Sequence, residues 1–457
     1  MSIKEKISKL TYHWDYLVVA GVFLILHVFM QTDYWDDIIT CSALAKNNFN
    51  LIKYMNNVYY SWSSRILVQA AGIIIGYFPN GLWKIMDILF VLLLYHSINK
   101  IICFYTPLSD RELTKKYSLF LTLSFLCFPY CLMASAGWIT TTTVYTWCFA
   151  LSFYSISVLL SASQENKLSL STCFLFGFAL LYAANFDITS IVLLLIWIVL
   201  FLTSAKSRSF YILYVEGLAA ILFNLILFLA CPGNMNRMKY DGIYHGTSDF
   251  VELTFLGHLR VGINSTFYHF VSIPNAVLFL CCLVLLFCTL IKTKRIFIRL
   301  LSFIPLAVNL FWTGYMFLFY TLKNRQLTYI YPDDDFIVGS RAEQYCTMLS
   351  AIVMILVILY LMAYLTDFSK LSLQLICILM LFGLLPQIAV GFTTTASASV
   401  IRTSSFFYFA LILCCNMLIR SCNLLKTRLC HVLLSVTGAL GAIVSLLQTL
   451  RHIMVYG

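Results

Sequence analysis

Charged side chains are scarce in this chain: they make up 11% of its 457 residues, against 61% hydrophobic residues. A soluble domain carries roughly a quarter of its residues as charged side chains, so this composition excludes one. No polar stretch is long enough to form a separate soluble domain. Apolar runs of about 20 residues recur from end to end, which is typical of membrane-spanning helices. The sequence predicts one polytopic membrane domain, residues 1–457.

Motifs of metal and transport proteins are also missing. There is no Cys-x-x-Cys pair and no His-Glu-x-x-His, so a structural zinc site is not indicated. The 16 cysteines lie nearly all in apolar segments, where cysteine acts as a small hydrophobic residue. No inverted repeat of the transporter kind is visible. The net charge of +11 does not point to nucleic acid, because lysine and arginine of membrane proteins collect in cytoplasmic loops; we expect no nucleic-acid partner.

Basic residues set the expected orientation. Three lysines precede the first apolar run, which reads as an uncleaved signal anchor with a cytoplasmic N-terminus. Segment 66–78 is apolar but short, and counting it as a crossing puts Lys100 and Arg111 outside. The positive-inside rule therefore favours a re-entrant or interfacial segment there. We expect an all-α helical bundle of about 13 transmembrane helices in the cell membrane.

This topology places most polar clusters on the extracytoplasmic face. The first outer loop shows helical spacing of apolar residues between polar ones, for example Ile38, Ile39, Ala43 and Leu44, which predicts interfacial helices. The expected outer loops are about 31–65, 136–142, 231–265, 322–343 and 392–404.

Three carboxylates follow the first apolar helix: Asp33, Asp36 and Asp37. On a helix these positions share a face, and clustered carboxylates raise the pKa of at least one member. Such a group acts as a general base or binds a hard cation. The alternative is a solvated helix start, where acidic residues suit the helix dipole. Asp187 lies near the outer end of a later helix and is a further candidate for the same site.

Four arginines lie in the expected outer loops beside small or turn-forming residues: Arg65, Arg237, Arg341 and Arg402. The planar guanidinium suits phosphate oxygens, so these residues are candidates for an anionic head group. Pairing with outer-loop aspartates or with lipid phosphates is the alternative.

Aromatic and amide side chains complete the candidate site. Trp62, Trp138, Tyr145 and Trp147 are placed to stack on sugars, although interfacial aromatic residues are commonly belt residues. Asn234 follows Pro232 and Gly233 in a turn after an apolar helix, where a simple helix stop is the alternative.

The order of these features resembles the GT-C class of membrane glycosyltransferases. It looks more closely like a family of uncharacterised, glucosyltransferase-like bacterial multi-spanning proteins. The similarity covers roughly residues 15–240. Its matching pieces are Asp36-Asp37, Tyr60-Ser61-Trp62-Ser63-Ser64-Arg65, the segment from Gly137-Trp138 to Tyr145-Thr146-Trp147, and Pro232-Gly233-Asn234 with Arg237.

The resemblance implies an extracytoplasmic reaction on a polyprenyl-phosphate-linked sugar. The outer arginines hold the lipid phosphate, and Asp36 or Asp37 takes the proton of an acceptor hydroxyl on a surface glycan or glycolipid. The cofactor is unknown, with a divalent cation such as Mg or Mn as one option, and membrane lipids surround the protein. Three alternatives stay open: a Wzy-like polysaccharide polymerase, a lipid-linked sugar flippase or transporter, and a non-catalytic scaffold.

Overall fold

The computed structural model of the chain describes residues 14–32, 34–78, 80–108, 110–164, 169–204, 207–244, 253–322, 341–393 and 396–456. Every regular element in this part of the chain is helical, which confirms the predicted all-α class. The predicted signal anchor begins in residues 1–13, outside the described residues.

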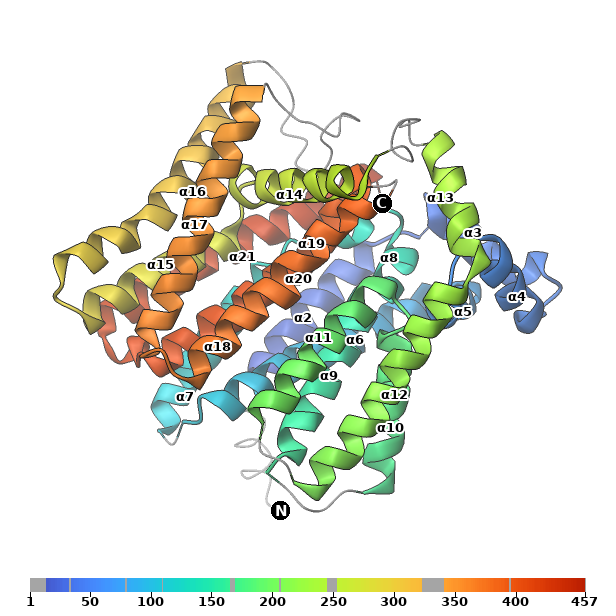
Figure 1. Ribbon diagram of the computed structural model, residues 1–457, viewed down its shortest axis with the longest axis horizontal. Helices are drawn as coiled ribbons and strands as arrows, with labels where there is room; N and C mark the ends of the chain where they lie inside the picture. Colours follow the sequence, from blue (N-terminus) through green and yellow to red (C-terminus); the bar gives the residue numbers. More distant parts are fainter. Residues whose placement is uncertain are drawn as a thin grey trace.

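The helices of the N-terminal half follow in close succession. They are α2 (Trp14–Phe29), α3 (Asp36–Lys46), α4 (Leu51–Ser61), α5 (Ile66–Tyr77), α6 (Asn80–Tyr105), α7 (Arg111–Leu126), η1 (Tyr130–Ala134), α8 (Trp138–Val144), α9 (Thr146–Ala162), α10 (Leu170–Ala183), α11 (Asp187–Thr203) and α12 (Arg208–Ala230). In Figure 1, α3, α4 and α5 gather at the right edge of the molecule.

The second half packs against the first mainly through α20 and α21, which both contact α7. Its helices are α13 (Pro232–Tyr244), α14 (Phe255–Ser272), α15 (Ala276–Lys292), α16 (Ile296–Leu322), α17 (Arg341–Leu365), α18 (Lys370–Cys377), η3 (Ile378–Leu384), α19 (Leu385–Ala389), η4 (Val390–Phe392), α20 (Ala396–Ser421), η5 (Leu424–Lys426) and α21 (Arg428–Tyr456). Helices α15, α16 and α17 form the left side of Figure 1, and α14 lies across the top.

Eight helical stretches of the described chain are long and apolar enough to cross a membrane, or nine if α14 and α15 count as one bent span. This is the composition of a multi-pass membrane protein. The sequence predicted about 13 crossings, which is more than the number of described helices that are long enough to span the membrane. Helices α10 and α11, two of the expected crossings, have 14 and 17 residues, which at 1.5 Å per residue is about 21 and 26 Å, short of a bilayer core of about 30 Å. Helix α5 has 12 residues and covers the segment that was predicted to be re-entrant or interfacial.

The chain between α12 and α15 differs from the expected outer loop at 231–265. Helices α13 and α14 occupy most of it, and α14 meets α15 at an angle of 72°. The helix expected at 266–291 is therefore broken after Ser272. Asn275 starts the second half, because its Oδ1 accepts hydrogen bonds from the backbone N–H groups of Val277 and Leu278 at 2.9 and 3.2 Å.

Other expected loops are also shorter than predicted. Helix α8 begins inside 136–142, and α20 begins inside 392–404. Of the expected loop 322–343, residues 323–340 lie outside the described residues. Residues 31–65, the expected first outer loop, hold α3 and α4, which confirms that this segment is helical.

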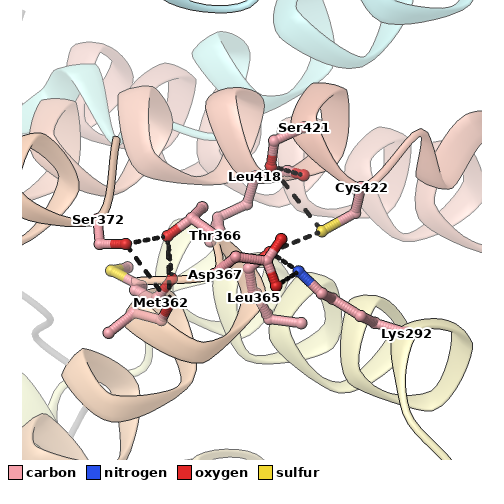
Figure 2. Close-up of polar contacts among 10 residues, drawn as sticks. Lys292, Met362, Leu365, Thr366, Asp367, Ser372, Leu418, Ser421 and Cys422 are labelled. Carbon is pink, nitrogen blue, oxygen red and sulfur yellow. Dashed lines mark hydrogen bonds and ion pairs between the residues drawn. The ribbon is translucent and has the colours of Figure 1, made fainter. Parts of the chain in front are cut away.

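The turn between α17 and α18 is bonded to the end of α15 (Figure 2). The ammonium group of Lys292, at the end of α15, donates to the Leu365 carbonyl at 2.8 Å and pairs with Asp367 at 2.7 Å. The Thr366 and Ser372 hydroxyls lie 2.7 Å apart across the turn. These contacts satisfy groups that a helix end leaves exposed.

Candidate functional site

Asp37 is fully buried and holds the start of α8. Its two carboxylate oxygens accept the backbone N–H groups of Ile139 and Thr140 at 3.0 and 2.8 Å. The first N–H groups of a helix have no acceptor within that helix, and here the carboxylate of α3 accepts two of them. Gly137 precedes them with φ of 99°, and a Cβ there meets the Asp37 carboxylate at 2.5 Å. The chain therefore needs glycine at 137 to seat this carboxylate.

Burial sets the proton affinity of Asp37. Desolvation raises its pKa from 3.8 to about 6, against the opposing effect of the two backbone donors. Asp36, one residue earlier, is exposed. Asp33 lies outside the described residues. Asp36 and Asp37 therefore lie in different environments.

We expect Asp37 to lower stability as the pH rises. Its native pKa lies above the ordinary value, so the folded state binds a proton more tightly, and the free energy of unfolding falls as pH rises from about 4 through about 6. Infrared difference spectra of wild type and Asp37→Asn should show a protonated carboxyl band that disappears with a midpoint near pH 6 only in wild type. A carboxyl already ionised at about pH 4, as in a solvated aspartate, contradicts this assignment.

Arg65 and Asp187 form a partly exposed ion pair. Nε and Nη2 of Arg65 both lie 2.7 Å from Oδ1 of Asp187, and the side chains are 19% and 18% exposed. The guanidinium also lies over the Phe186 ring at 4.7 Å. Among the described residues, no hydrogen bond to Oδ2 of Asp187 is formed. One carboxylate oxygen beside an arginine is thus left for a further partner.

Asparagine side chains fix the backbone around this pair. Asn185, in the turn between α10 and α11, caps the start of α5, because its Oδ1 accepts the N–H groups of Leu67 and Val68 at 2.8 and 3.2 Å. Its amide nitrogen donates to the Ser64 carbonyl at 3.3 Å. Asn234 accepts the Ser64 N–H at 3.2 Å. The predicted Asn234 therefore holds the loop that carries Arg65.

Trp62 and Arg237 lie beside this loop. The Arg237 guanidinium is 5.2 Å from the centre of the Trp62 ring, and Tyr240 meets the same ring edge-on at 5.7 Å. Tyr145 packs against Phe186 at 5.0 Å, so it reaches the ring beneath Arg65. We name these six residues the Arg65 cluster: Trp62, Arg65, Tyr145, Asp187, Asn234 and Arg237.

Asp37 and the Arg65 cluster lie at opposite ends of α8. Asp37 binds its first turn, whereas Tyr145 follows its last residue. Seven residues of helix at 1.5 Å each span about 10 Å. Asp37 thus positions the helix that presents Tyr145 to the cluster.

The remaining predicted binding residues lie elsewhere. Trp138 is fully buried and stacks against Tyr130 at 5.9 Å. Trp147 is buried and donates from Nε1 to Asp87 at 2.9 Å. Arg402 lies on α20, half-buried. Arg341 begins α17, and its side chain is outside the described part of the structure.

Asp87 anchors a buried polar group that sequence reasoning missed. Its Oδ2 accepts the Tyr130 hydroxyl and lies 2.9 Å from His27 Nε2, and both acid and imidazole are at most 1% exposed. Nδ1 of His27 is 2.7 Å from the Phe23 carbonyl and so carries a proton. A carboxylate inside an apolar run was the available signal.

The predicted carboxylates do not form a cation site among the described residues. No three His, Cys, Asp or Glu side chains in this part of the chain are grouped closely enough to bind a metal ion. Both oxygens of Asp37 already accept backbone hydrogen bonds. The ligand set does not fit Mg or Mn, and no step below uses a cation.

Comparison with known proteins gives no family for this chain: no family model, no curated protein and no solved structure matches it. The similarity to GT-C glycosyltransferases thus stays a prediction from the motifs quoted above.

Proposed function

We propose that the chain transfers a sugar from a polyprenyl-phosphate-linked donor to a glycan or glycolipid acceptor at the Arg65 cluster. The observation that carries the proposal is the partly exposed Arg65–Asp187 pair, which stands beside a second arginine and an indole. Guanidinium groups suit a phosphate, and a carboxylate with an uncommitted oxygen suits a hydroxyl proton. The cluster gathers five residues predicted separately from the sequence: Trp62, Arg65, Tyr145, Asn234 and Arg237.

The proposed step balances around the anomeric carbon. Oδ2 of Asp187 takes the proton of an acceptor hydroxyl, whose oxygen then bonds to the anomeric carbon. The bond from that carbon to the lipid-phosphate oxygen breaks, and the phosphate leaves with the electron pair. Arg65 and Arg237 stabilise the negative charge that develops on the phosphate. In this scheme Asp37 is a positioning residue, while the exposed Asp36 is the alternative base.

The orientation belongs to the same proposal. Lys292, Arg295 and Arg299 lie around the end of α15 and the start of α16, and Lys292 is bonded to the turn between α17 and α18. By the positive-inside rule we assign this end to the cytoplasm. The Arg65 cluster then faces the extracytoplasmic side, where a polyprenyl-linked sugar arrives from the lipid.

The test compares two carboxylates that each pair with a cation. We expect Asp187→Asn to lower sugar transfer by about 100-fold or more, as for loss of a general base, and Arg65→Lys to weaken phosphate binding because lysine cannot form the fork. Asp367→Asn, at the Lys292 pair, is the matched control. The measurement is surface-glycan and lipid-linked sugar analysis of deletion cells that carry each variant.

The results separate the candidates. Accumulation of the lipid-linked donor with Asp187→Asn, but not with Asp367→Asn, supports the proposal; the same result with Asp36→Asn moves the base to Asp36. Unchanged glycans in all these variants contradict it. The polymerase alternative draws on one observation, the use of both Asp37 oxygens in holding α8. It predicts shorter glycan chains with Arg65→Lys and wild-type chains with Asp187→Asn and with Asp36→Asn.

A further inference from the structure

Two cysteines are in contact where the ends of α15, α17 and α20 meet. The Cys288 thiol of α15 donates a hydrogen bond to the sulfur of Cys422. Cys288 is fully buried, whereas Cys422 directly follows α20 and is half-buried. The two thiols come from different helices, so only the fold brings them together.

Lys292 reaches the same place from α15. It follows Cys288 by one helical turn, so both side chains lie on one face of the helix. Its ammonium group donates to the Leu365 carbonyl oxygen at 2.8 Å, and the Cys422 thiol donates to that same oxygen at 3.9 Å (Figure 2). A shared acceptor thus brings a positive charge close to the Cys422 sulfur.

Cys422 lies at the edge of the membrane-spanning part of the chain. The apolar stretch of α20 ends one residue before it, and Asp367, the partner of Lys292, is 80% exposed. Arg420, two positions earlier, lies over the Tyr117 ring at 5.5 Å instead. A half-buried thiol beside a cation is the environment typical of reactive cysteines, whereas cysteines inside an apolar core are inert.

The surroundings lower the pKa of Cys422 to about 7. The hydrogen bond from Cys288 is the largest cause. The Ser421 hydroxyl, 3.8 Å from the sulfur, and the charge of Lys292 act in the same direction. Burial and the Asp367 carboxylate oppose them. Thiol and thiolate forms of Cys422 are therefore both present near neutral pH, and the thiolate is the nucleophile.

The same two helices carry a second thiol pair. Cys415 of α20 donates a hydrogen bond to Cys281 of α15. These two residues are 1% and 0% exposed and lie within stretches that are apolar enough to cross a membrane. They share the sulfur contact of the first pair but not its access to water, so they serve as an internal control.

We propose that Cys422 is a redox-active thiol that reacts with small-molecule disulfides and then forms a reversible disulfide with Cys288. The Cys422 thiolate attacks one sulfur of the small disulfide, which releases one thiolate and leaves a mixed disulfide on Cys422. Cys288 then attacks the Cys422 sulfur and releases the second thiolate, which takes the Cys288 proton. The two cysteines together lose two electrons, and the small disulfide is reduced to two thiols.

This chemistry does not involve the Arg65 cluster, and it rests on the proposed function only for the orientation. That orientation places Cys422 at the cytoplasmic face, where thiols are kept reduced. The pair is then a dithiol at rest. It becomes a covalent link between the ends of α15 and α20 when small disulfides accumulate.

The experiment uses the full chain in nanodiscs and oxidised glutathione as the small disulfide. The protein is equilibrated with graded ratios of oxidised to reduced glutathione, free thiols are blocked with N-ethylmaleimide, and unreduced peptides are analysed by mass spectrometry. We expect a Cys288–Cys422 cross-link and, at the same ratio, no Cys281–Cys415 cross-link. Cys288→Ala should stop the reaction at a Cys422 peptide that carries one glutathione, and Cys422→Ser should remove both products.

A second measurement tests the role of the charges. The rate at which iodoacetamide alkylates Cys422 should be half-maximal near pH 7 in wild type. Lys292→Met should move this midpoint to higher pH and Asp367→Asn to lower pH, because they remove charges of opposite sign. A general loosening of the turn would move both midpoints in the same direction.

Several results overturn the proposal, and the first needs no variant: wild type forms no Cys288–Cys422 cross-link at any glutathione ratio. Equal cross-linking of Cys281 and Cys415 overturns it too, since contact alone then decides. A bond from Cys422 to Cys430 of α21, or midpoint shifts of the same sign in the two charge variants, also contradicts it. Failure of the sugar-transfer test leaves all these outcomes unchanged, because none of them measures transfer.

Discussion

Asp87→Ala is expected to destabilise the protein by about 3 to 5 kcal/mol, because a buried polar group left without its partner costs about 1 to 3 kcal/mol and three such groups are affected. The substitution removes the shared acceptor of His27, Tyr130 and Trp147, all in the apolar core between α2, α6 and α9. Each donor left without an acceptor loses its own hydrogen bond in a medium that offers no water. The measurement is the thermal unfolding of purified protein in detergent, followed by size-exclusion chromatography.

Two further variants show whether the cause is the unpaired group. His27→Leu combined with Asp87→Leu removes both members of the pair and should restore part of the loss, because the buried imidazole is no longer left without its partner. Leu89→Ala is the neighbouring control, since Leu89 lies on α6 but is 53% exposed on the surface of the bundle. An Asp87→Ala protein with the same melting temperature as wild type would show that the hydrogen bonds to Asp87 do not stabilise the core.

Gly137→Ala is expected to cost about 2 to 6 kcal/mol. The backbone of Gly137, with φ of 99° and ψ of 145°, strains any residue with a Cβ at about 1 to 3 kcal/mol. The new methyl group also meets the Asp37 carboxylate at 2.5 Å, and displacing the carboxylate leaves two helix donors buried without it, at about 1 to 3 kcal/mol. Chemical or thermal unfolding of the purified variant measures the sum.

A double-mutant cycle with Asp37→Ala separates the two causes. In that background Gly137→Ala should cost only the backbone strain, so the two substitutions should be less than additive. Gly21→Ala is the control, because a Cβ at Gly21 in α2 meets no atom within 4 Å and alanine favours a helix by about 1 kcal/mol. Strict additivity would mean that Gly137 and Asp37 act independently.

Composition predicted the fold class because apolar runs have only one structural solution in lipid. Apolar spacing around Ile38 and Ala43 likewise predicted the helices of the first loop. The break between α14 and α15 was missed, although Pro274 and Asn275 stand between them and are ordinary stop and start signals. An apolar run hides such a signal when hydropathy alone is read.

The candidate site was predictable as a set of residue types but not as a set of neighbours. Arg65 and Asp187 are 122 positions apart, and nothing local to either one specifies the pairing. Asp37 was expected to share a site with Asp36, yet it points into the protein to meet residues about 100 positions later. One sequence signal was available for the buried centre, the single carboxylate at 87 in an apolar helix.

The bend between α14 and α15 has a consequence for how the protein is made. Helix α14 ends at residue 272, whereas α19, which packs against Gly262, begins at residue 385, 113 residues later. During synthesis, α14 and α15 therefore leave the ribosome long before the surface that receives α14 exists. Helix α14 can reach its final position only after α19 has been made, so the close contact between Gly262 and the Ile388 carbonyl is among the last to form.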